Sequence, residues 1–144
     1  DYPPADEEKK IIATHGAGDG QMSPEAWGVA VVADNAALES AAAVVAGIRL
    51  ADEVVDYIAA LVRATRDVAD LESGASPRAG ARLAGAARAR AAIEGRDFVI
   101  PDDVKALAPA LLRHRLVLSP AAEIEGRLVE DVVRTIIESI EAPR

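Results

Sequence analysis

Alanine is the residue type that most constrains this fold. The chain has 32 alanines among its 144 residues, whereas aromatic residues make up only 3%. Alanine has the highest intrinsic helix propensity and is depleted from β-strands. A chain of this length is one domain's worth, and it can bury a core without metal or disulfide support. The composition therefore predicts an all-α fold, a helical bundle.

The charge balance and the residue inventory exclude several classes of protein. The chain has 16 basic and 24 acidic residues, a net charge of −8, and no cysteine. Net acidity argues against a domain whose main task is to grip nucleic acid, and the missing thiols exclude disulfides and cysteine nucleophiles. No uninterrupted apolar run approaches the roughly 18 residues of a membrane helix. We therefore expect a cytoplasmic protein with no nucleic-acid partner and no membrane insertion.

Helix-period apolar spacing predicts most of the bundle. After a short helix that ends near Gly16, helices are expected over about 35–46, 51–66, 77–94 and 129–140. Very short β pieces are expected at 48–50 and 98–100, with a third candidate at 115–118. Residues 67–75 are expected to form a polar loop. Pro101 starts a further helix that Pro109 should break, because proline removes a hydrogen bond inside a helix.

The start of the 77–94 helix carries the most informative local feature. Residues 76–100 contain five arginines against two acids, in a chain that is otherwise acidic. Ser76 is placed to cap the helix and Pro77 suits its first position. Arg78 then opposes the helix dipole beside free backbone N–H groups, an arrangement that can hold a phosphate. The alternative is a surface arginine that pairs with Glu72 or Asp70.

Other candidate groups have simpler explanations. Each acidic pair lies near a predicted helix start, where negative charge complements the dipole. Both histidines lie at predicted helix ends, and no third ligand accompanies them, so no metal site is expected. No GxxxxGK[ST] loop occurs, so the chain has no nucleotide cradle of its own. The acidic pairs are Asp52-Glu53, Asp102-Asp103 and Glu130-Asp131, and the histidines are His15 and His114.

One segment resembles a known family. Gly74-Ala75-Ser76-Pro77-Arg78-Ala79 resembles the sensor-2 motif of AAA+ ATPases, and the wider chain resembles the lid of the MoxR family. Segments similar to that lid recur in order along the chain: Asp1-Tyr2-Pro3, Asp56-Tyr57-Ile58, Leu61 to Arg66, Glu94 to Val104, and His114-Arg115-Leu116.

The resemblance implies an AAA+ lid domain over residues 1–144. Residues 1–5 would be a linker from an ATPase core upstream of Asp1, which would hold the Walker A and B segments. Arg78 would reach the γ-phosphate of ATP, while Ser76 and Pro77 shape the helix end. Tyr2 and Pro3 would lie at the hinge and flank the nucleotide base.

The resemblance also implies a parent protein and its partners. Such a parent hydrolyses ATP with Mg²⁺ as a homo-oligomeric ring, usually a hexamer. It acts as a chaperone-like remodeller or inserts metal into target proteins, often with a von Willebrand factor A domain partner. The lid would pass the nucleotide state from its own core to the neighbouring subunit. By itself this chain should be inactive and bind no cofactor.

Two rival interpretations come from the residues alone. The chain could be a plain helical interaction module that binds a partner through an apolar groove without any nucleotide. A helix-turn-helix DNA binder is disfavoured by the net charge of −8.

Overall fold

The structure is a computed structural model that describes residues 2–16 and 24–143. It divides into two compact units, residues 1–38 and residues 39–144, which are described separately. The assignment of residues 1–144 to one lid domain stays a prediction. Asp1, the first residue of the predicted linker, lies outside the described residues.

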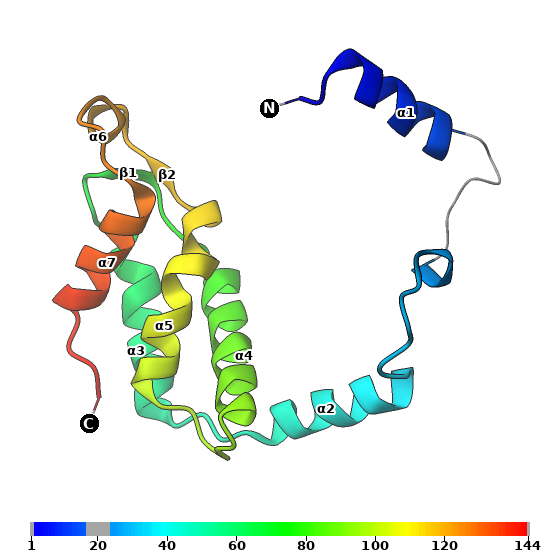
Figure 1. Cartoon of the computed structure of the whole chain (residues 1–144). Helices are drawn as coiled ribbons and strands as arrows, with labels where there is room; N and C mark the ends of the chain where they lie inside the picture. Colours follow the sequence, from blue (N-terminus) through cyan, green and yellow to red (C-terminus); the bar gives the residue numbers. More distant parts are fainter. Residues whose placement is uncertain (1, 17–23, 144) are drawn as a thin grey trace. The chain divides into compact units, whose positions relative to one another are not determined.

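The described part of the N-terminal unit contains two short helical elements and the start of a longer helix (Figure 1). Helix α1 (Ala5–His15) has acidic residues in its first turn, where they complement the helix dipole. Gly16 follows it and donates its N–H to the carbonyl of Ile12, so the predicted stop is confirmed. None of the residues of α1 is buried. A 3₁₀ turn, η1 (Pro24–Trp27), comes next in the described part of the unit.

Helix α2 (Asn35–Gly47) crosses the boundary between the two units. It begins after Asp34, in agreement with the helix expected over about 35–46, and Oδ1 of Asp34 accepts a hydrogen bond of 2.8 Å from the N–H of Ala37. This is the bond that an N-cap aspartate makes. Like α1, the helix has no buried residue.

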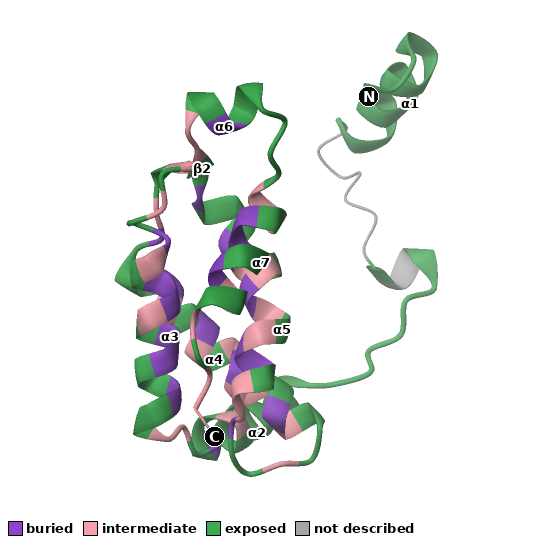
Figure 2. Cartoon of the chain, turned by 90° about the vertical axis from the view of Figure 1, so that its left-hand side faces the viewer, coloured by how far each residue is buried: buried purple, intermediate pink, exposed green. Residues whose placement is uncertain are grey.

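The C-terminal unit is built around α3 (Asp52–Ala64), α4 (Pro77–Ile93), α5 (Pro101–Leu112) and α7 (Val129–Ser139) (Figure 1). Figure 2 shows the buried residues on the sides of these helices that face one another. Leu61 and Leu83 are completely buried, and so is Ala87 on α4, where a small side chain lets helices approach closely. The predicted all-α bundle is therefore confirmed.

The connection between α4 and α5 reverses the chain. Gly95 ends the turn after α4 with φ of +72°, a conformation that favours glycine. The next residues form a parallel bridge in which Arg49 N–H donates to Asp97 O at 2.9 Å and Val99 N–H donates to Arg49 O at 3.0 Å. The two predicted β pieces, 48–50 and 98–100, thus pair with each other.

A buried carboxylate, that of Asp103, holds together the connection between α4 and α5, which together form a helical hairpin. Asp103 is 1% exposed, and both of its oxygens accept hydrogen bonds from Arg96, at 2.7 and 2.8 Å. It also accepts the N–H of Ile100 at 3.0 Å, and the Nε of Arg90 on α4 lies 3.3 Å away. Burial by itself raises the pKa of Asp103, but these hydrogen bonds and positive charges outweigh it, so the pKa falls below its ordinary value. Sequence reasoning assigned Asp103 only to dipole complementarity and missed this network.

One short strand and one short helix of the structure are not among the predicted elements. Residues 67–75 contain β1 (Leu71–Ser73), which pairs antiparallel with β2 (Val117–Leu118). The prediction of a polar loop is wrong there, because backbone pairing with a strand far along the chain overrides local polarity. The strand expected within 115–118 is confirmed. Helix α6 (Pro120–Ile124) was not predicted; Ser119 caps it by accepting the N–H of Ala122.

The predicted break at Pro109 is also wrong. Helix α5 continues through Pro109 to Leu112, and only then does the 3₁₀ turn η2 (Arg113–Arg115) begin. Val104 and Ala108 before the proline, and Leu112 after it, are all buried on one side of the helix. Their burial holds the helix together across the one hydrogen bond that proline removes.

Replacing Pro109 with alanine should raise the free energy of unfolding by about 1–2 kcal/mol. Alanine restores the missing bond, while the loss of proline's restriction of the unfolded chain offsets part of the gain. Urea denaturation followed by circular dichroism measures the change. Pro101→Ala, at the first position of the same helix, is the control and should not stabilise the protein. A less stable Pro109→Ala protein would contradict the prediction.

Candidate functional site

The end of α3 holds the segment that leads into α4. Thr65, the residue after α3, is completely buried. Its hydroxyl donates to the carbonyl of Val62 at 2.6 Å and accepts the N–H of Ala75 at 2.8 Å. The Nε of Arg66 donates to the carbonyl of Ala75 at 2.9 Å. Side chains from the end of α3 therefore bind both polar backbone groups of Ala75.

Gly74 packs directly against the same helix end. A Cβ added to it would lie 2.6 Å from the carbonyl oxygen of Thr65 and 2.8 Å from the Cα of Arg66. Real Cβ atoms essentially never come this close to backbone, so any other residue would push the two segments apart. Glycine at this position is what lets the chain before α4 lie on α3.

Ser76 and Pro77 then begin α4 as predicted, with one difference. Ser76 occupies the N-cap position in an extended conformation and Pro77 is the first helical residue. The side chain of Ser76 makes no capping hydrogen bond, so that part of the prediction is wrong. The N–H of Ala79, which a serine cap would bind, donates instead to the carbonyl of Ser76 at 2.9 Å.

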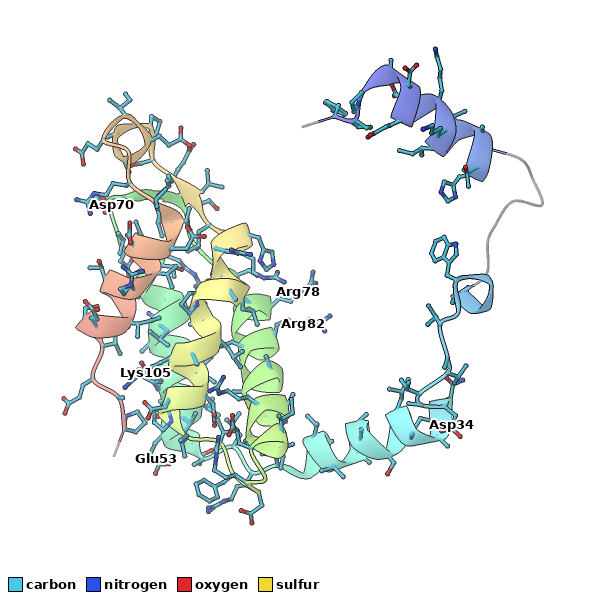
Figure 3. The ribbon with its side chains drawn as sticks, viewed as in Figure 1. Asp34, Glu53, Asp70, Arg78, Arg82 and Lys105 are labelled. Carbon is cyan, nitrogen blue, oxygen red and sulfur yellow. The ribbon has the colours of Figure 1, made fainter. Side chains whose placement is uncertain are left out.

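Arg78 stands exposed on this start of α4. Figure 3 shows its side chain, and that of Arg82 one turn later, pointing away from the other bundle helices. Within the described part of the chain, neither arginine forms a hydrogen bond or an ion pair. The alternative partner Asp70 pairs instead with Arg127, at 3.2 Å. The surface pairing of Arg78 with Asp70 or Glu72 is thus not formed among these residues.

The five predicted site residues fall into two groups. Ser76, Pro77 and Arg78 come together in one exposed turn of the C-terminal unit. Tyr2 and Pro3 belong to the N-terminal unit, where Tyr2 is 99% exposed. Their place at a hinge beside the nucleotide base stays a prediction.

Chemically, this turn offers a cation and one free backbone donor. Pro77 has no N–H and Ala79 donates its N–H to Ser76, so the N–H of Arg78 is the one left for a ligand among the first three residues of α4. Nucleophiles are absent from the turn except for the Ser76 hydroxyl. Between residues 2–16 and 24–143, no cluster of three or more metal-binding side chains occurs. The turn can hold one anionic group.

An apolar cavity of about 390 Å³ lies between α3 and α4, next to this turn. Val55, Ile58 and Val62 of α3 and Gly80 and Ala84 of α4 contribute to its wall. Pro77 also lines it. The small residues Gly80 and Ala84 of α4 thus border open apolar space. In the described residues, no helix is long and apolar enough to cross a membrane.

Sequence reasoning missed the supports of the turn. From the sequence, Thr65 and Arg66 are placed only in the segment that resembles the helix before the motif, and Gly74 only at the end of a loop and the start of the motif-like segment. In the sequence, a threonine next to apolar helical positions is a weak signal for a buried hydroxyl, because threonine is also common on surfaces.

Comparison with known proteins identifies the class of domain. The family model described as the AAA lid domain matches residues 63–136, which run from the end of α3 into α7. The chain therefore belongs to the AAA lid domain family. A crystal structure from Cytophaga hutchinsonii, of a protein provisionally named an ATPase, has the same fold. The match covers the whole of this chain and 45% of the Cytophaga hutchinsonii chain, with a TM-score of 0.76 and 23% sequence identity.

Curated relatives confirm the resemblance to MoxR proteins. Chaperone MoxR1 of Mycobacterium tuberculosis is 34% identical over 99% of this chain and 38% of its own length. YeaC of Bacillus subtilis is 40% identical over 69% of this chain and 31% of its own length. Protein MoxR of Methylorubrum extorquens is 42% identical over 51% of this chain and 22% of its own length. The chain thus spans about a quarter to two fifths of the length of these relatives.

Proposed function

We propose that this chain is the nucleotide-sensing lid of a MoxR-type AAA+ ATPase, with Arg78 as its contact to the γ-phosphate of ATP. The observation that carries the proposal is the state of Arg78. It is an exposed cation at a helix start, without an acidic partner among the described residues, on a backbone that α3 holds in place. Membership of the AAA lid family supports the same conclusion.

The physical basis is charge complementarity. A cation in the first turn of a helix is disfavoured by the dipole, at a cost of a few tenths to about 1 kcal/mol. A bound phosphate reverses this balance, because it accepts hydrogen bonds from both the guanidinium and the free N–H of Arg78. In this proposal, Ser76 and Pro77 shape the start of the helix, and Tyr2 and Pro3 flank the nucleotide base.

Binding and hydrolysis of ATP belong, in this proposal, to an ATPase core that supplies Mg²⁺ and the phosphate loop. The lid supplies one positive charge and passes the nucleotide state to the neighbouring subunit of a homo-oligomeric ring, a hexamer, in the cytoplasm. The ring remodels target proteins like a chaperone or helps to insert metal into them, with a von Willebrand factor A domain protein as its partner. The name of the Mycobacterium tuberculosis relative, Chaperone MoxR1, supports the chaperone role.

Arg78→Ala in the full-length ATPase should lower ATP turnover by about tenfold or more. A charge-assisted hydrogen bond contributes about 1.5–3 kcal/mol, and each 1.4 kcal/mol of lost transition-state stabilisation is about tenfold in rate. Thermal unfolding of the lid should change little, because the exposed side chain has no partner among the described residues. Steady-state phosphate release measures the rate.

Arg82→Ala is the matched control, since it removes the same charge from the same face of α4 one turn away. It should leave turnover within about threefold of the unchanged protein, because a contact one turn along α4 lies about 6 Å further from the γ-phosphate. Equal losses in both variants would indicate a general effect of positive charge. The sensing role of Arg78 would then have to be abandoned.

A second candidate function is favoured by the apolar cavity between α3 and α4. The chain would then be a nucleotide-independent helical interaction module. This candidate requires that Arg78→Ala leave ATP turnover unchanged. It also requires that Ala84→Glu, which places a charge at the cavity wall, weaken the binding of a protein partner. The opposite pair of results supports the nucleotide-sensing lid.

A further inference from the structure

Thr65 lies outside the turn that would touch nucleotide, yet it holds the backbone that carries Arg78. We infer that Thr65 is a positioning residue for Arg78: its buried hydroxyl fixes the backbone of Ala75, and through it the first turn of α4. The inference rests on the proposed function of Arg78 and adds the device that keeps this arginine in place.

The hydroxyl of Thr65 is used in both directions. It donates to the Val62 carbonyl at 2.6 Å and accepts the N–H of Ala75 at 2.8 Å, in a site from which solvent is excluded. A buried amide without a partner is costly, so the N–H of Ala75 keeps to this oxygen. Serine could make the same two bonds, whereas valine, which has the same shape as threonine, can make neither.

The restraint on Ala75 is transmitted to Arg78 over a short distance. Two residues separate them, and one of these is Pro77, whose ring fixes its φ. On the other side of Arg78, Ala79 is completely buried and its N–H donates to the carbonyl of Ser76. The backbone of Arg78 is therefore held on both sides, and only its side chain is free to reach a ligand.

A second contact reinforces the first. The Nε of Arg66 donates to the carbonyl of Ala75 at 2.9 Å in a part-buried contact, although Arg66 as a whole is exposed. Gly74 permits this contact, because its missing side chain lets the segment lie on the backbone of Thr65 and Arg66. The residues at the end of α3 thus pack closely against Gly74 and hydrogen-bond both the N–H and the carbonyl of Ala75.

The position of Arg78 should affect the rate of ATP turnover. A misplacement of about 1 Å in a group that contacts the transition state can cost roughly 100-fold in rate. Loss of the Thr65 hydroxyl should therefore reduce the turnover number through Arg78, with the Michaelis constant for ATP nearly unchanged.

The test uses the full-length ATPase with single and double substitutions. Thr65→Val should lower kcat by about fivefold or more, and Thr65→Ser should restore it to within about twofold. The decisive variant combines Thr65→Val with Arg78→Ala. If Thr65 acts through Arg78, the double variant should be no slower than Arg78→Ala alone, because interactions that work as one unit are not additive.

Thr135→Val is the matched control. Its hydroxyl also donates to a backbone carbonyl, that of Asp131 at 3.0 Å, but on α7 and away from this turn. Its kcat should not change. If circular dichroism shows that Thr65→Val does not fold, Arg66→Met, which removes only the part-buried second contact, should lower kcat and show the same non-additivity with Arg78→Ala.

The outcomes separate this inference from the proposed function. If Arg78→Ala lowers turnover but Thr65→Val does not, or if their losses multiply in the double variant, Thr65 is not a positioning residue and the function of Arg78 stands. If Arg78→Ala has no effect on turnover, the proposed function itself is wrong.

Discussion

Asp103→Ala should destabilise the C-terminal unit by about 3 kcal/mol, the lower end of the range for breaking a buried ion pair. The carboxylate is nearly completely buried and accepts two bonds from Arg96 and one from the backbone of Ile100. Its removal leaves the Ile100 N–H unpaired and frees the hairpin between α4 and α5. The loss stays at the lower end because the side chain of Arg96 is 24% exposed and can turn to water. Urea denaturation at pH 7 measures it.

Asp102→Ala is the control for this substitution. Asp102 is the neighbouring residue in the same helix turn, but its side chain is 78% exposed and its ion pair with Lys105 lies on the surface. The cost of its removal should be below about 1 kcal/mol. Similar losses in the two variants would show that helix-dipole complementarity, and not the buried network, explains both acids.

The lowered pKa of Asp103 also predicts that the free energy of unfolding depends on pH. Its pKa is lower in the folded protein than the ordinary value of 3.8, so the unfolded state binds the proton more tightly. The stabilisation is therefore present above the unfolded pKa and is lost as pH falls through the folded pKa. The difference in unfolding free energy between the unchanged protein and Asp103→Asn should shrink as pH falls below about 4. A difference that is constant from pH 7 to pH 3 would contradict a charged Asp103.

Gly74→Ala should cost about 2–3 kcal/mol of stability, because a single methyl group would be forced against the backbone of α3. The close atoms are the carbonyl oxygen of Thr65 and the Cα of Arg66, and neither can turn away as a flexible side chain would. Turnover of the full-length ATPase should fall as well, because the same shift moves Arg78. Thermal and urea unfolding measure the first effect, and phosphate release measures the second.

Gly85→Ala makes the same chemical change in the middle of α4 and should have the opposite sign. Gly85 is exposed, and a Cβ added there meets nothing within 4 Å. Alanine in a helix interior is more favourable than glycine by about 0.5–1 kcal/mol. If both glycines respond alike, the close approach at Gly74 has no energetic importance.

Much of the fold could be predicted from the sequence because its helices bury one apolar face each. The spacing of Val54, Ile58 and Leu61 in α3 places all three on the buried side, and the same rule predicts α4 and α7. The rule fails where distant residues decide the structure. The strand β1 exists because β2 pairs with it, and α5 continues through Pro109 because of what it packs against.

The candidate site could be predicted only in its exposed part. Serine and proline at a helix start carry local signals, so capping rules place residues 76–78 correctly at the start of α4, while their role as a site stays a prediction. The roles of Thr65 and Asp103 depend on partners 10 and seven residues away, across a change of direction that local rules do not describe. Both are polar residues whose burial only the packed structure reveals.

The placement of the aromatic residues gives the chain two separate optical reporters. Its single tryptophan, Trp27, lies in the N-terminal unit and is 61% exposed, whereas Tyr57 is 3% exposed in the bundle. Burial, followed by the negative charge of Asp102, raises the pKa of the Tyr57 phenol above its ordinary value. Tyrosinate absorbance in mild alkali, measured with Tyr2 replaced by phenylalanine, therefore registers opening of the bundle, because Tyr57 ionises more readily once it meets water. Tryptophan emission follows the N-terminal unit instead, so one sample can tell which unit responds when nucleotide or a partner is added.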